Sequence, residues 1–63
     1  MEEYSKTELR EAHRTILSTL SKCEKAEPKI KEGTAQKTLI IRRITAFKIA
    51  LSLIEKSIDY EYS

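Results

Sequence analysis

Apolar side chains recur at helical spacing through the second half of the chain. One line of them advances by alternating steps of four and three residues: Ile40, Ile44, Phe47, Leu51, Ile54 and Ile58. This is the heptad spacing of a helix that packs lengthwise against another helix. We therefore predict a helix from about Thr34 to Ile58, with residues 59–63 fraying beyond it.

A second apolar line runs beside the first and widens the apolar arc of this helix. It consists of Leu39, Ala46, Leu53 and Tyr60, with Ala50 next to it and with Ile41 and Ile49 further round. One neighbouring helix cannot cover so wide an arc, and each Ile or Leu left exposed forfeits roughly 1.5–3 kcal/mol. We therefore expect the chain to associate with itself, as a homodimer or in a higher order.

The first half of the chain predicts another helix. Ser5 and Glu8 have the spacing of a capping box, flanked by Tyr4 and Leu9 at the positions of a hydrophobic staple. A heptad line follows: Leu9, Ile16, Cys23 and Ile30. This line is flanked by the small residues Ala12, Thr19 and Ala26 and by Leu17 and Leu20. The small side chains would let a neighbouring helix approach closely.

Pro28 leaves two interpretations for the end of the first helix. A proline inside a helix removes a hydrogen bond and disfavours helical geometry at the preceding residue. The helix therefore either stops near Ala26 or bends there and continues to Glu32. Because Ile30 keeps the heptad phase, the bent continuation is the favoured interpretation.

The residues after Glu32 predict a tight turn. Gly33 fits the left-handed position that ends a helix, and Thr34 fits the N-cap of the next one. Two helices joined by so short a turn must be antiparallel neighbours. The predicted fold class is all-α. Residues 1–63 form one helical-hairpin domain, which assembles into a four-helix bundle or a larger homo-oligomer.

Composition excludes several kinds of protein. A chain of 63 residues lies in the size range where a lone core is marginal. One Cys and one His exclude an internal disulfide and argue against a metal site within one chain, and no cofactor is expected. The acidic N-terminus is unlike a signal peptide, and Arg42, Arg43 and Lys48 interrupt the best apolar run. We expect a cytoplasmic protein without a membrane span.

No set of residues forms a catalytic constellation. His13 and Cys23 would lie about 15 Å apart along one helix, so they cannot meet within one chain as a nucleophile and its base. Cys23 lies on the heptad line and is predicted to be a small core residue. His13 borders that line as a packed or interfacial side chain. We therefore predict that the chain is not an enzyme.

Basic charge is concentrated in the middle of the sequence. Residues 22–48 hold eight Lys and Arg against three Glu, a net charge of +5, whereas residues 1–21 carry −1 and residues 49–63 carry −2. A hairpin would bring this positive charge to one end of the molecule. Either an anionic partner binds there, or the charges are ordinary solvated groups that keep the protein soluble.

The turn supplies a candidate anion-binding site. The residues predicted to contact a ligand are Thr34, Gln36, Lys37, Thr38, Arg42 and Arg43. The N-terminus of a helix attracts anions, and Arg is well suited to bidentate phosphate contacts. The alternative is plain helix capping with solubilising charge. Arg43 lies close to the apolar arc and needs an anionic ligand or an acid, for which Glu8 and Glu11 of a neighbouring helix would serve.

Three segments carry a resemblance to a known family. They are Lys22-Cys23-Glu24-Lys25-Ala26, Gly33-Thr34-x-Gln36-x-Thr38-Leu39, and Arg43-Ile44-x-Ala46-x-x-Ile49-Ala50-x-x-Leu53-Ile54. Together they resemble a family of short helical proteins from Gram-positive bacteria and their prophages. The match is fairly specific in the Gly-Thr-x-Gln-x-Thr-Leu turn.

The helical hairpin and its polar turn are also faintly similar to phage anti-defence sponges, small helical oligomers that sequester cyclic-nucleotide immune signals. That similarity implies that Thr38-Leu39 opens the second helix and that Arg42 and Arg43 contact ligand phosphates. The aromatic residue of that family has only Phe47 as a counterpart here, and the predicted packing buries it.

Two hypotheses of function follow. The first is a non-catalytic homo-oligomeric protein that binds an anionic small ligand, such as a cyclic nucleotide, between the turn of one subunit and neighbouring helices. The second is a protein–protein interaction or inhibitor module that acts through its apolar helix. Nucleic-acid binding is disfavoured, because the net charge is only +2 and no aromatic residue is interleaved with the cations.

Overall fold

The computed structural model describes the backbone of residues 4–62 and the side chains of residues 4–58. Helix α1 spans Lys6–Ala26, a short 3₁₀ helix η1 spans Glu27–Lys29, and helix α2 spans Ala35–Tyr62. The described residues contain helices and turns without strands, which confirms the all-α class.

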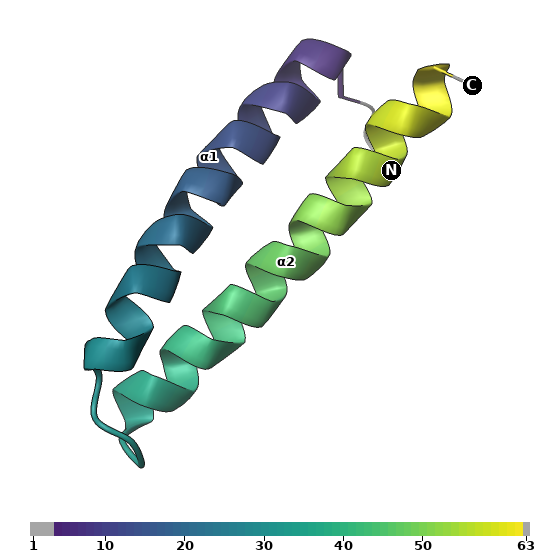
Figure 1. Ribbon diagram of the computed structural model, residues 1–63. Helices are drawn as coiled ribbons and strands as arrows, with labels where there is room; N and C mark the ends of the chain where they lie inside the picture. The colour runs from purple at the N-terminus through teal and green to yellow at the C-terminus, as the bar shows by residue number, and fades with distance from the viewer. Residues whose placement is uncertain (1–3, 63) are drawn as a thin grey trace.

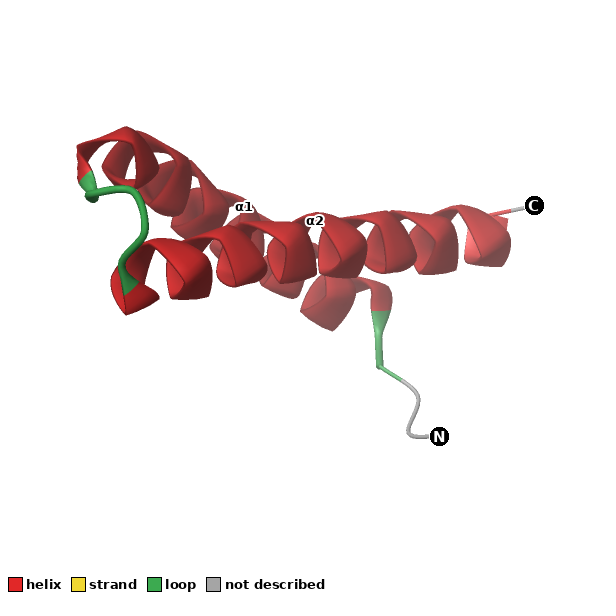
Figure 2. Cartoon of the chain, turned by 90° about the horizontal axis from the view of Figure 1, so that it is seen from below, coloured by secondary structure: helices red, strands yellow, loops and turns green. Residues whose placement is uncertain are grey.

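The two long helices lie side by side and run in opposite directions (Figure 1). The view from below shows the same hairpin, with the turn at one end and both the start of α1 and the end of α2 toward the other (Figure 2). The molecule is an elongated rod of 44 × 19 × 18 Å. The predicted hairpin is therefore confirmed, and the turn is remote from the start of α1 and the end of α2.

A single layer of side chains between the helices forms the core. Its best buried members are Leu20 of α1 and Ile40 and Leu51 of α2, which are 6%, 9% and 7% exposed. The remaining residues of the predicted inner line of α2 are half-buried: Ile44, Phe47, Ile54 and Ile58. Cys23 is also half-buried in this layer. The inner line predicted from the heptad spacing is confirmed.

Helix α1 presents a slightly different face from the one its heptad line predicts. Leu9, Ile16 and Cys23 face the core as expected, but Leu20 is better buried than any of them. The small residues Thr19 and Ala26 are exposed. They therefore do not bring α2 closer within one chain.

The second apolar line of α2 faces away from α1. Leu39 and Leu53 are 48% and 59% exposed, and Ala46 is exposed as well. Ile49, further round the helix, is 56% exposed. The side chain of Tyr60 lies outside the described residues. One hairpin thus covers one side of α2, as the width of the apolar arc predicts, and self-association stays a prediction.

The ends of the helices follow from local chemistry. The capping box is confirmed, because Ser5 Oγ accepts a hydrogen bond from Glu8 N and Glu8 Oε1 accepts one from Ser5 N, each at 3.1 Å. Helix α2 continues to Tyr62, beyond the predicted end at Ile58. Across the described residues, neither long helix has the apolar length that a bilayer span requires.

The favoured bent continuation of α1 to Glu32 is wrong. Helix α1 ends at Ala26, and Pro28 lies in the first turn of η1. Proline has no N–H to donate to the preceding turn of an α-helix, whereas the start of a new helix does not need that donor. After η1 the backbone of Ile30 becomes extended, with φ −90° and ψ 135°, and the chain turns toward α2.

Candidate functional site at the hairpin turn

Two residues shape the turn between η1 and α2. Gly33 has a φ of +81°, the left-handed conformation that glycine adopts without steric cost. Thr34 Oγ1 accepts a hydrogen bond from Lys37 N at 3.2 Å and donates one to Lys31 O at 2.8 Å. The predicted N-cap is therefore confirmed. The same hydroxyl also ties the turn to the start of α2.

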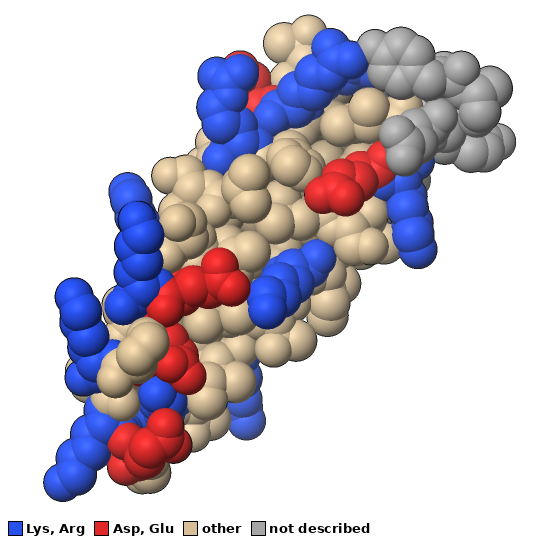
Figure 3. Space-filling model, in the orientation of Figure 1, with Lys and Arg blue, Asp and Glu red and all other residues tan. Residues whose placement is uncertain are grey.

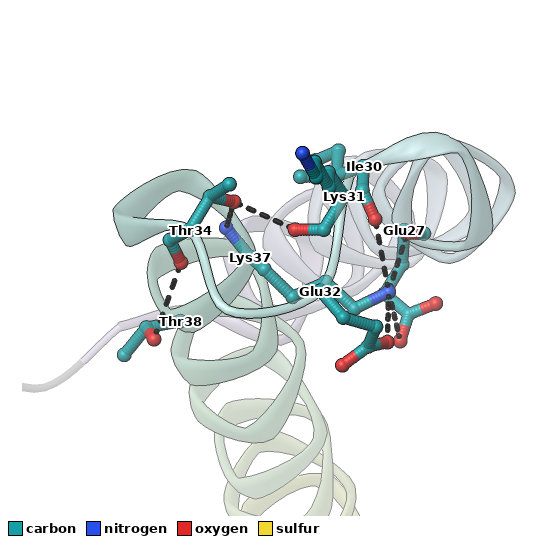
Figure 4. Close-up of polar contacts among 7 residues, drawn as sticks. All are labelled: Glu27, Ile30, Lys31, Glu32, Thr34, Lys37 and Thr38. Carbon is teal, nitrogen blue, oxygen red and sulfur yellow. Dashed lines mark hydrogen bonds and ion pairs between the residues drawn. The ribbon is translucent and has the colours of Figure 1, made fainter.

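Lys37 reaches from the first turn of α2 back to η1 and the residues that follow it (Figure 4). Its Nζ donates to Glu27 O at 2.8 Å and to Ile30 O at 3.4 Å. It also forms ion pairs with Glu27 Oε1 at 3.2 Å and Glu32 Oε1 at 3.1 Å. Its side chain is only 7% exposed. An ammonium group has three protons, so these four acceptors already occupy its capacity to donate.

Burial and the two carboxylates act in opposite directions on Lys37. Desolvation disfavours the charged ammonium, but the hydrogen bonds to Glu32 and Glu27 and the attraction of both carboxylates favour it more strongly. The pKa of Lys37 therefore lies above its ordinary value. Lys37 remains a cation and adds a hydrogen bond to the carbonyl groups of Glu27 in η1 and of Ile30 just after it.

The sequence holds a signal for this role that the prediction missed. Position 37 lies three residues before Ile40, so it continues the inner line of α2 by one more turn. A lysine on a core-facing line must find acceptors within the hairpin or leave a buried charge unpaired. Glu27 and Glu32 supply those acceptors from across the turn. The prediction placed Lys37 at the N-terminus of α2 without considering this phase.

The other predicted ligand contacts are more accessible. Thr38 Oγ1 donates to Thr34 O at 3.5 Å, a long contact that leaves the hydroxyl able to rotate. Gln36, Arg42 and Arg43 are exposed. The structure thus separates the predicted set into two groups. Thr34, Lys37 and Thr38 have side chains hydrogen-bonded within the turn, whereas Gln36, Arg42 and Arg43 are exposed.

Residues 22–48, which carry most of the basic charge, also contain three acids. Each of the three forms an ion pair with one of two lysines. Glu27 and Glu32 pair with Lys37, and Glu24 pairs with Lys48 at 3.9 Å. Six exposed cations remain without an acidic partner among the described side chains. They are Lys22, Lys25, Lys29, Lys31, Arg42 and Arg43, which we call the turn-end cations. Figure 3 shows basic side chains projecting around the turn end of the molecule.

The grooves between the helices do not coincide with the turn-end cations. The groove nearer the turn, of about 330 Å³, is lined by Glu24, Glu27, Ile41, Ile44 and Thr45. Its carboxylates disfavour an anion there. Any anion held by the turn-end cations would therefore lie on the outer surface of the hairpin or against another chain.

A second groove, of about 540 Å³, lies toward the opposite end of the hairpin. Its lining residues are Arg10, His13, Arg14, Leu17, Glu55 and Ile58. Within it, His13 Nε2 lies 2.8 Å from Glu55 Oε2 and joins α1 to α2. His13, which is predicted to be a packed or interfacial side chain, is half-buried against Glu55 within one hairpin.

Comparisons with known proteins add no relative. No family model, no curated protein and no solved structure matches this chain. The geometry and charge of the turn end are therefore the basis of the functional proposal.

Proposed function

We propose that this chain is a non-catalytic, homo-oligomeric binding protein that sequesters an anionic ligand of the nucleotide type at its turn end. The observation that supports the proposal is the charge balance of that end. All three of its acids are engaged by Lys37 and Lys48, so the six turn-end cations face solvent without intramolecular compensation. A concentration of uncompensated cations on a small surface attracts phosphate groups.

The chemistry of these cations favours phosphate over a generic anion. Arg42 and Arg43 are adjacent on α2, and guanidinium groups form bidentate hydrogen bonds with phosphate oxygens. Gln36 and Thr38 offer neutral hydrogen-bonding groups one to two turns earlier in the same helix. The resemblance to anti-defence sponges, in which Thr38-Leu39 and the two arginines have counterparts, points to a cyclic nucleotide as the ligand class.

A thermal-shift titration tests this proposal. The protein is heated with mono-, di- and cyclic nucleotides, and a ligand that binds only the folded state raises the Tm. Saturation at one hundred times Kd adds about 2.7 kcal/mol of stability. Arg42→Gln should lose most of the shift, whereas Lys56→Gln, which removes an exposed cation of α2 far from the turn, should retain it. No shift with any nucleotide would refute the proposal.

A second candidate function rests on the exposed apolar residues of α2. The apolar surface of α2 consists of Leu39, Ile49 and Leu53. A different protein could bind it by receiving this helix in an apolar groove. Capture of one stoichiometric protein partner, lost in Leu53→Glu and kept in Arg42→Gln, would favour this module over a ligand-binding protein.

A further inference from the structure

The ion pairs that join α1 and η1 to α2 lie on one face of the hairpin. They are His13–Glu55, Glu24–Lys48 and Glu27–Lys37, which together define the ion-paired face. Successive helical residues turn by about 100°. On this spacing, His13 and Glu24 lie on one side of the buried line of α1, and Lys48 and Glu55 lie on the matching side of α2.

The opposite face of the hairpin is built from small and apolar side chains. The same spacing places there Thr19, Ala26, Leu39, Ala46, Ala50 and Leu53, which we call the apolar face. Leu39 and Leu53 are about half exposed, whereas small side chains between them keep the surface low. This face has the size pattern that lets another pair of helices pack closely.

The exposed area of the chain matches what a second copy would remove. A compact monomer of 7.3 kDa exposes about 4,200 Å² by the usual scaling of area with mass. This hairpin exposes 5250 Å². The excess of roughly 1,000 Å² is close to the ~800 Å² that each partner buries in an interface of standard size. The radius of gyration, 14.2 Å, likewise exceeds the ~11 Å of a compact chain of this length.

Charges at the two ends of the apolar face decide how two copies align. Lys22 and Arg43 border this face near the turn, and Glu8 and Glu11 border it near the start of α1. We infer that a second copy of this chain covers the apolar face with its turn at the opposite end. Arg43 of each copy then lies beside Glu8 and Glu11 of the other, while alignment at the same end would bring like charges together.

This alignment also matches large and small side chains along α2. With the two-fold axis beside Ile49 and Ala50, Ala46 of one copy faces Leu53 of the other. A large side chain opposite a small one fills the interface without a void. The inference rests on the self-association within the proposed function and not on the ligand, and its tests contain no nucleotide.

Sedimentation equilibrium tests which face is covered. Leu53→Glu places a charge on the apolar face, where Leu53 is 59% exposed. Leu17→Glu places the same charge on the ion-paired face, at a leucine of similar exposure, 50%. The wild type and Leu17→Glu should form dimers at micromolar concentration, and Leu53→Glu should be a helical monomer. A monomeric wild type, or a dimer that Leu53→Glu leaves intact, would overturn the inference.

Charge reversal tests the alignment. Arg43→Glu should weaken the dimer about tenfold or more, because two symmetric attractions become repulsions. The double variant R43E/E11R should restore much of the loss. A dimer that tightens in Arg43→Glu would show that the turns lie at the same end and would refute the opposite-end alignment.

Cysteine cross-linking provides a measurement that does not depend on how the charged variants fold. Ala46→Cys and Leu53→Cys chains, both carrying Cys23→Ser, are mixed and oxidised. A disulfide requires Cβ atoms about 3.5–4.5 Å apart. The opposite-end alignment predicts mixed 46–53 disulfides in excess of either like-with-like product, and the reverse excess would contradict it.

Discussion

Two leucines of α2, two residues apart, can be truncated to distinguish burial within one hairpin from burial between two copies. Leu51 is 7% exposed and belongs to the layer between the helices, whereas Leu53 is 59% exposed on the apolar face. The substitution Leu→Ala removes the same atoms at both positions. Any difference in the free energy of unfolding therefore reports the surroundings of the side chain.

The expected loss in the free energy of unfolding differs severalfold between Leu51→Ala and Leu53→Ala. Replacing a buried Leu by Ala costs about 2–5 kcal/mol. Leu53 has only about two-fifths of its side chain covered, so Leu53→Ala should cost about 0.6–1.2 kcal/mol in a single hairpin. A lone core of this size rarely supplies more than about 3–5 kcal/mol, so Leu51→Ala should leave much of the chain unfolded.

Urea denaturation followed by far-ultraviolet circular dichroism measures both variants over a range of protein concentrations. The cost of Leu51→Ala should dominate in dilute solution, and the cost of Leu53→Ala should rise with concentration as a second copy covers that side chain. Equal costs in dilute, monomeric protein would refute the assignment of Leu51 to the core and Leu53 to the outer surface.

Three further predictions concern the turn. Thr34→Ala should lower the free energy of unfolding by about 1 kcal/mol, because Lys37 N loses its cap; Thr34→Ser retains the hydroxyl and should lose much less in the same urea titration. Gly33→Ala should cost about 1 kcal/mol through its φ of +81° alone, because a Cβ there would meet no atom within 4 Å; an unchanged or raised Tm would contradict this reasoning. Because the pKa of Lys37 is raised in the folded state, its ion pairs contribute fully below the pKa of an unfolded lysine, about 10.4. That contribution is lost as the pH rises through the higher folded value. The stability difference between wild type and Lys37→Met should therefore be constant at neutral pH and shrink above about pH 10.4, and a difference that persists at the alkaline extreme would exclude the ion pairs as its cause.

Local signals in the sequence determine the two helices and where they begin. The capping box of Ser5 and Glu8 and the N-cap at Thr34 act over three residues, and both have the predicted geometry. Gly33 has the predicted left-handed φ, but it lies in the turn and does not end a helix, because α1 stops at Ala26 and η1 at Lys29. The inner line of α2 can also be predicted from the sequence, because heptad spacing determines which side chains share a face of a helix. Even the exposed second line follows from counting more apolar residues than one neighbour can cover.

Tertiary structure decides how those faces meet. Pro28 permits two paths, and only the packing of the turn shows that α1 stops at Ala26 and that η1 leads into an extended Ile30. Position 37 falls on the inner line of α2, but only the fold shows that its ammonium lies among acceptors from η1 and the turn. The reason is physical. A helix fixes the spacing of its own side chains, but the partner of a charge across a turn depends on where a second backbone brings its carbonyls and carboxylates.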